Sequence, residues 1–122
     1  MPRMLSRLPG PILLALFLFA APAGAADGYV SGFEDLPLAP GLVSVPDAGI
    51  AFDNPTGRIV VAYARGAVAK SAVEKFYNST LPQLGWAAET PKGSYLREGE
   101  RLTIEVLGKD GAVTVRYSLA PK

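Results

Sequence analysis

The clearest pattern in the chain is an alternation of apolar and polar residues in its C-terminal part. The apolar positions are Leu102, Ile104 and Val106 before an Asp-Gly pair, and Val113, Val115, Tyr117 and Leu119 after it. Alternation on both sides of Asp110-Gly111 predicts an antiparallel β-hairpin with one buried face and one solvated face. A two-residue loop would pair Glu105 with Arg116. A four-residue loop would shift the pairing by two residues and leave every side chain on the same face.

A helical pattern precedes this hairpin. Its apolar residues fall on one helical face, with charged and amide side chains on the other: Val73, Phe76, Tyr77, Leu81 and Leu84. This spacing predicts one amphipathic helix that begins near Ala69. Because proline has no backbone N–H to donate, Pro82 predicts that the main helix ends near Thr80, with one further turn to Leu84 left open. Gly85 is expected to stop the helix.

Two strands are expected before the helix. Residues 49–53 predict a short strand, and Asn54-Pro55-Thr56-Gly57 predicts a turn, since proline fixes φ and glycine accepts positive φ. Residues 58–65 are compact and rich in β-branched side chains, which indicates a second strand. This second strand is apolar on both sides. We therefore expect the helix to cover one of its faces and part of the segment 33–45 to cover the other.

After the helix, residues 86–90 predict a strand that residues 95–97 would continue beyond Pro91-Lys92-Gly93. The resulting order is β-β-α-β-β-β. This order indicates an α+β domain with an antiparallel sheet of about four to five strands and one helix packed on one face. Residues 49–122 would form this domain. Residues 27–48 combine glycine and proline with large apolar side chains, which predicts an extended segment laid over the domain rather than a solvated linker.

The first 26 residues have the layout of a cleavable secretory signal peptide. Two arginines precede an apolar run from Ile12 to Ala20, which is roughly half the length that spans a bilayer. Small residues follow, and cleavage is expected after either Ala25 or Ala26. The mature protein would then be periplasmic or secreted, in a bacterium, with no stable membrane anchor.

Composition narrows the possible chemistry. The chain has 122 residues, 12 basic and 11 acidic side chains, and no cysteine or histidine. Disulfides, thiol nucleophiles, zinc fingers and Ser-His-Asp triads are therefore excluded. Removing the first 26 residues leaves 96, and because Arg3 and Arg7 are lost, ten basic side chains then face eleven acidic ones. Such a near-neutral domain is not expected to bind nucleic acid, and no cofactor is predicted.

Four segments together carry a resemblance. They are Phe76-Tyr77, Leu81-Pro82-Gln83-Leu84-Gly85-Trp86, residues 52–60 and residues 97–102. In these segments the chain resembles a group of small exported bacterial proteins of unknown function, over about residues 52–121. The resemblance implies a shared exported α+β domain, and it supplies no activity, substrate or catalytic residue.

Two functions are compatible with these features. The first is a non-enzymatic structural or protein-interaction module of the cell envelope, which binds another envelope protein through an exposed sheet edge or through the polar face of the hairpin. The alternative is a carrier of a small apolar ligand in a pocket between helix and sheet. The side chains that would line this pocket are Tyr63, Phe76, Tyr77, Trp86 and Tyr117. The same residues also fit an ordinary core.

Carboxylates, hydroxyls, lysine and arginine remain, and paired carboxylates are the one hydrolytic device that this composition allows. A hydrolase would need Glu98, Glu100 or Glu105, but Glu105 is also explained by a cross-strand ion pair. Asp47 and Asp53 lack the spacing of a calcium-binding loop. We therefore predict no catalytic residue and no metal site, and we do not expect an enzyme.

Overall fold

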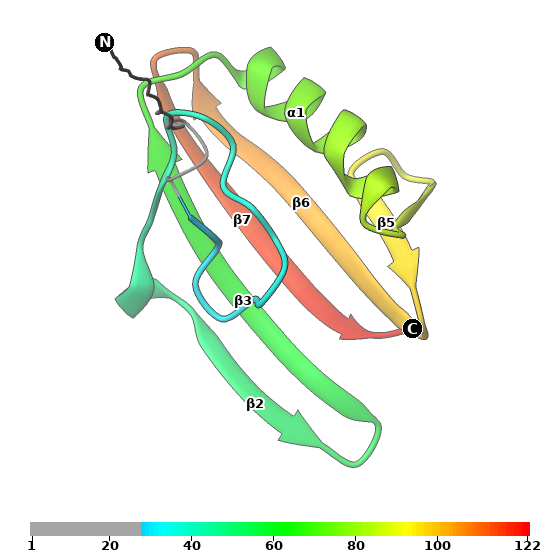
Figure 1. The fold of residues 1–122 in the computed structure, drawn as a ribbon. Helices are drawn as coiled ribbons and strands as arrows, with labels where there is room; N and C mark the ends of the chain where they lie inside the picture. Colours follow the sequence, from blue (N-terminus) through cyan, green and yellow to red (C-terminus); the bar gives the residue numbers. More distant parts are fainter. Residues whose placement is uncertain (1–27) are drawn as a thin grey trace, which may run out of the picture.

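A computed structural model describes residues 28–122. They form a mostly antiparallel sheet with a single helix packed against it, which confirms the α+β class (Figure 1). The sheet has seven strands, so the expected number of four to five is wrong. The predicted signal peptide, with its cleavage positions at Ala25 and Ala26, lies outside the described residues.

The elements follow one another along the chain with short connections. They are β1 (Val43–Ser44), the 3-10 helix η2 (Pro46–Ala48), β2 (Ile50–Asn54), β3 (Gly57–Gly66), α1 (Lys70–Gln83), β4 (Ala87–Glu89), β5 (Ser94–Arg97), β6 (Glu100–Lys109) and β7 (Ala112–Pro121). In the sheet the order is β1-β3-β7-β6-β5-β4, and β2 also pairs with β3. β1 and β2 therefore lie along the same edge of β3, at its two ends.

Two hairpins follow the sequence predictions. β6 and β7 are joined by the two-residue Asp-Gly loop, and Glu105 pairs with Arg116 as expected. β2 and β3 are joined across Asn54 and Gly57. The Asn54 side-chain oxygen accepts the backbone N–H of Thr56 at 3.0 Å, a local bond that favours the turn. In both hairpins the turn residues and the alternation of apolar and polar residues specify the same pairing of the two strands. The register of each hairpin is therefore determined by neighbouring residues.

The region from Trp86 to Arg97 differs from the prediction of one interrupted strand. It forms the β4–β5 hairpin instead, in which Ala88 pairs with Tyr95. The chain reverses in the Pro91-Lys92-Gly93 interruption, which is long enough for a loop and not only for a bulge. Trp86 itself lies before β4 and is buried.

The end of α1 also differs from the prediction. The helix continues through Pro82 to Gln83, so the expected end near Thr80 is wrong, and the further turn is present as part of the same helix. Proline removes only one hydrogen bond this close to the end of a helix, and Pro82 lies on the exposed side while Leu81 is fully buried against the sheet. Gly85, at φ 94°, donates to the Pro82 carbonyl, and Trp86 donates to the Leu81 carbonyl. This is a Schellman cap, and it confirms Gly85 as the helix stop.

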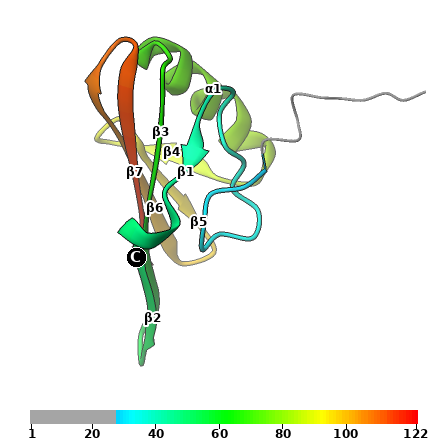
Figure 2. The same ribbon diagram turned by 90° about the vertical axis from the view of Figure 1, so that its left-hand side faces the viewer.

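The extended chain from residue 28 to residue 42 packs on the same side of the sheet as α1 (Figure 2). Its buried side chains are Val30, Phe33, Leu36, Leu38, Ala39 and Leu42. The rings of Phe33 and Tyr117 are 6.4 Å apart. The expectation that this segment covers the other face of β3 is therefore wrong. A helix of 14 residues does not cover this wide sheet alone, and the segment completes the cover of the same face.

Candidate interaction site

The face of the sheet that points away from α1 carries an exposed apolar stripe. In β3, the side chains of Ile59, Val61 and Tyr63 lie on this face and are only half-buried. β2 adds Ile50 and Phe52, which pair with Val61 and Ile59 and are 57% and 51% exposed. We call these five residues the open stripe. A contiguous exposed apolar surface of this kind is typical of an interaction site.

The other half of the open face is polar. β6 and β7 present mostly hydroxyl and charged side chains there, with Leu107 as one exposed apolar side chain at the end of β6. The polar side chains are Thr103, Glu105, Thr114, Arg116 and Ser118. Arg116 Nη1 lies 3.5 Å from Glu105 Oε1, which confirms the predicted cross-strand pairing and adds little stability because both side chains are solvated. The polar half therefore has no need of a covering layer, and the open stripe is confined to β2 and β3.

β2 presents unpaired backbone groups beside this stripe. In an antiparallel ladder, successive residues direct their N–H and C=O groups alternately toward and away from the neighbouring strand. The Tyr63 carbonyl accepts the Val45 N–H at 2.8 Å, so the odd-numbered residues of β3 face the edge that β1 and β2 share. Their partners in β2 are Ile50, Phe52 and Asn54. Ala51 and Asp53 therefore direct their N–H and C=O groups outward, where no described strand pairs with them.

The β2 edge has little of the protection that is usual for an edge strand. Proteins shorten such strands, or place charged side chains (above all lysine), proline or a bulge in them. Of these devices, β2 has only the charge of Asp53. Over residues 28–122, β1 has only two residues and β4 three. β2 has five, Ile-Ala-Phe-Asp-Asn, all in continuous register with β3. β2 is therefore more open to pairing with another chain than β1 or β4 is (Figure 1).

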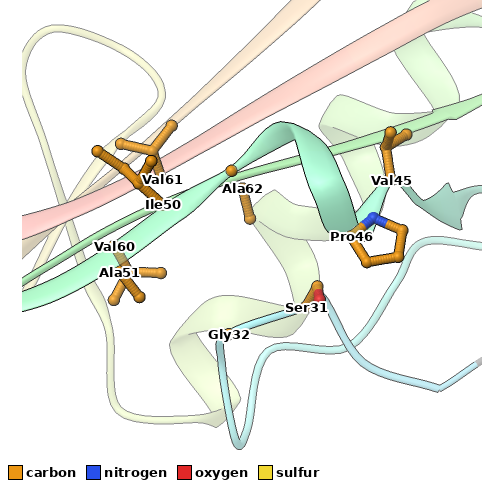
Figure 3. Close-up of a pocket in the computed structure, with 10 residues that line it drawn as sticks. Ser31, Gly32, Val45, Pro46, Ile50, Ala51, Val60, Val61 and Ala62 are labelled. Atoms are coloured by element: carbon orange, nitrogen blue, oxygen red, sulfur yellow. The ribbon is translucent and has the colours of Figure 1, made fainter.

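A cleft of about 180 Å³ lies beside β2, on the side of the sheet that carries α1. Figure 3 shows the turn at Ser31 and Gly32 on one side of it, with Ala51 and Val60 across from this turn and Pro46 at one end. Its described lining contains no charged side chain, and Ser31 supplies the only hydroxyl. We call this space the edge cleft.

A second cleft, of about 330 Å³, lies between α1 and β6. Its lining includes Glu74 and Asn78 from α1, Lys92 from the loop before β5, and Tyr95. The Tyr95 hydroxyl donates to Asn78 Oδ1 at 2.7 Å. This volume is near the lower limit for small-molecule sites, and charged groups of both signs line the cleft.

The five aromatic residues predicted for a ligand pocket do not line a common cavity. Tyr77 and Tyr117 pack edge-to-face in the core, with ring centroids 5.7 Å apart. Phe76 packs edge-to-face on Tyr77 at 5.0 Å. Tyr63 lies on the open face, on the opposite side of the sheet from Tyr117. Of the five, only Tyr77 lines the cleft between α1 and β6.

Trp86, the remaining member of this set, is also a core residue. The guanidinium of Arg97 lies 4.3 Å from the centroid of its ring. Arg97 donates to the Leu84 carbonyl and to Asp35, both at 2.9 Å. A cation over the indole face stabilises the pair, and Arg97 ties the end of α1 to the extended segment. These contacts assign Trp86 a structural position that periodicity alone did not distinguish from a ligand platform.

The hydroxyl of Tyr77 joins three parts of the fold. It donates to the Pro37 carbonyl at 2.8 Å and accepts the backbone N–H of Ala39 at 3.2 Å. The Tyr117 hydroxyl lies 2.7 Å away, and because the single proton of Tyr77 is already used, Tyr117 donates to Tyr77. The network fastens the extended segment to α1 and β7. Nothing in the hydrophobic pattern reveals this use of the hydroxyl groups.

These buried tyrosines predict a loss of stability at high pH. Burial raises the pKa of Tyr77 from 10.0 to about 12, and burial also raises the pKa of Tyr117. Unfolded tyrosine loses its proton near pH 10, so above that pH the native state holds more protons than the unfolded state. Below pH 9 both tyrosines keep their protons in the folded and the unfolded state, so they should not change the free energy of unfolding as the pH varies. This free energy should fall by up to about 1.4 kcal/mol per pH unit for each tyrosine above pH 10.

Urea unfolding at pH 8, 10 and 11 measures this slope, with Tyr117→Phe as the matched variant. The variant lacks one of the two ionisable groups, so its stability should fall less steeply between pH 10 and 11. Equal slopes for the two proteins would contradict the assignment of the pH dependence to Tyr117.

The acidic side chains considered for catalysis have different surroundings. Glu100 pairs with Arg58, with Nε and Oε2 3.1 Å apart. Glu105 lies on the open face, and Glu98 occupies an exposed turn with φ 51°. Within residues 28–122, no cluster of three or more acidic groups could hold a metal ion.

Comparison with known proteins found no match. No family model, curated protein or solved structure matches the chain. The resemblance to small exported bacterial proteins therefore stays a prediction. In the part of the chain that the structure describes, no helix is long and apolar enough to cross a membrane.

Proposed function

We propose that this protein is a non-enzymatic interaction module of the bacterial cell envelope, which binds an extended segment of another protein by strand addition at β2. The observation that carries the proposal is the edge itself. Ala51 and Asp53 direct backbone groups outward, directly beside the exposed Ile50 and Phe52. Strand addition uses main-chain hydrogen bonds for affinity and alternate side-chain contacts for specificity, and β2 offers both. Location in the envelope rests on the predicted signal peptide.

The alternative, a carrier of a small apolar ligand, has less support. Its predicted aromatic residues are used in the core or lie on the other side of the sheet, as described above. The cleft between α1 and β6 is lined by Glu74 and Lys92, which do not suit an apolar ligand. This cleft serves as the comparison region in the test that follows.

The test combines peptide selection with amide hydrogen exchange. Ten-residue peptides are selected from a random displayed library against the protein. We expect the selected peptides to slow exchange at the Ala51 and Asp53 amides, since these N–H groups would become hydrogen-bonded in a new ladder. Protection confined to the cleft between α1 and β6, around Asn78 and Tyr95, would contradict strand addition and support the carrier.

A matched pair of substitutions isolates the backbone contribution. Asp53→Pro removes an outward N–H, whereas Asp53→Ala keeps this N–H and removes the same carboxylate. The outward N–H makes no bond to β3, so both variants should remain folded, with melting temperatures within a few degrees of the parent. We expect Asp53→Pro to bind the selected peptides at least tenfold more weakly than Asp53→Ala. Equal affinities would show that the peptides do not add to β2 through its backbone.

A further inference from the structure

The edge cleft is too small for most ligands but large enough for one side chain. Small-molecule sites usually exceed about 300 Å³, whereas an apolar cavity of about 150 Å³ holds a group the size of benzene. At about 180 Å³, the edge cleft belongs to the second class. Its floor is formed by Ala51 and by the buried Val60 and Ala62. An uncharged aliphatic side chain therefore fits it by both size and chemistry.

We propose that the edge cleft receives one aliphatic side chain of the strand that adds to β2. This inference rests on the proposed function. Residues directly opposite each other in an antiparallel ladder project to the same face. A partner residue opposite Ala51 therefore places its side chain on the cleft side of the sheet. The small Ala51 side chain leaves the cleft open to it.

Asp53 gives the partner strand a second feature. Its exposed carboxylate lies on the same face as Ala51, two residues further along β2. Arg58 is opposite Asp53 in the ladder but forms its ion pair with Glu100, and Asp53 makes no ion pair within the described range. Opposite charges on directly facing residues stabilise a sheet. The partner residue opposite Asp53, two positions before the aliphatic one in an antiparallel strand, should be lysine or arginine.

The remaining partner positions face the open stripe. Residues opposite Phe52 and Ile50 project to the other face of the sheet and should be apolar. The partner sequence is therefore basic, apolar, aliphatic, apolar. β3, the neighbour of β2 in the sheet, already shows this pattern: Arg58, Ile59, Val60 and Val61 pair with Asp53, Phe52, Ala51 and Ile50. The new strand would have the same pattern and would pair with the free edge of β2.

A second copy of this chain fits the edge less well. The symmetric β2–β2 pairing that uses all four outward groups of each strand centres on Phe52. It would place Asp53 of one copy opposite Ala51 of the other. A carboxylate would then lie at the mouth of the uncharged edge cleft, where losing its hydration is unfavourable. The occupant is therefore a segment of a different protein.

The experiment measures the affinity of fluorescently labelled peptides for the protein, which is expressed from its full-length sequence. The parent peptide is Gly-Ser-Arg-Ile-Val-Val-Thr-Gly. One variant has aspartate for the first valine, which would enter the edge cleft, and another has alanine for the arginine. We expect the aspartate peptide to bind at least tenfold more weakly than the parent, and the alanine peptide several-fold more weakly. Asp53→Asn should weaken binding of the parent peptide and leave the alanine peptide unchanged.

A protein variant tests the cleft from the other side. Ala51→Leu fills the edge cleft and keeps every backbone N–H. Compared with the unaltered protein, Ala51→Leu should bind the parent peptide at least tenfold more weakly. The two proteins should bind a peptide with glycine at the cleft position with equal affinity. Even if Ala51→Leu does not fold, the peptide substitutions still test the proposal.

The outcomes separate the two proposals. Equal binding of the valine and aspartate peptides, with the Ala51 and Asp53 amides protected by both, would overturn the cleft assignment and leave strand addition standing. Absence of protection at these amides with every peptide, library-selected ones included, would overturn strand addition itself. Protection that depends on protein concentration without peptide would identify a second copy as the occupant and overturn the assignment to a different protein.

Discussion

Replacing Tyr117 with alanine (Tyr117→Ala) should lower the free energy of unfolding by about 3–5 kcal/mol. The side chain is fully buried, packs against the rings of Phe33 and Tyr77, and donates a hydrogen bond to the Tyr77 hydroxyl. Its loss leaves a cavity where β7, α1 and the extended segment meet. Since a domain of this size has a total stability of about 5–15 kcal/mol, urea unfolding should show a large shift of the midpoint.

Tyr63→Ala is the matched control for this prediction. Tyr63 lies on the adjacent strand, opposite Arg116, but projects to the open face and is only half-buried. The same truncation there should cost about 1 kcal/mol or less, because no layer formed by residues 28–122 packs over it. A loss at Tyr63 as large as that at Tyr117 would show that another layer covers the open face in the isolated protein. This result would also weaken the case for a docking surface there.

The local parts of the fold could be predicted from the sequence because their causes are local. The β6–β7 register follows from the Asp-Gly loop and from an alternation that extends on both sides of it. The Asn54–Gly57 turn and the Gly85 helix stop each depend on a few neighbouring residues. In these cases the turn chemistry and the hydrophobic period agree, and one register satisfies both.

The errors arise where a pattern shows that a surface is apolar but not what covers it. Ile59, Val61 and Tyr63 form an apolar row, and a buried row and an open row have the same sequence signature. We expected this row to be covered by the chain around residues 33–45. The structure places that segment beside α1, because the helix alone leaves part of that face of the sheet uncovered. Which face the segment covers depends on contacts between residues far apart in the sequence, and a local hydrophobic pattern does not indicate it.

The candidate site was only partly predictable for the same reason. An exposed sheet edge was among the expected interaction surfaces. Which strand forms that edge depends on the order β1-β3-β7-β6-β5-β4, with β2 beside β3, and this order is set by pairings between distant residues. The edge cleft requires Ser31 and Ala51 to lie near each other across 20 residues of chain, so the sequence gives no direct sign of it. Large aromatic side chains suit a ligand pocket and a core equally well, and most of the five fill the core.

The extended segment should contribute to stability as strongly as a core strand does. Leu36 is 2% exposed and belongs to the same buried cluster as the residues of α1 and β7. Leu36→Ala should therefore cost about 2–5 kcal/mol, and unfolding should remain a single transition. Leu107→Ala, which removes the same atoms from a side chain that is 45% exposed, should cost less than about 1 kcal/mol. If Leu36→Ala instead gave a separate early transition, the segment would be an independently detaching strap. The wall of the edge cleft at Ser31 and Gly32 would then not be a fixed part of the binding site.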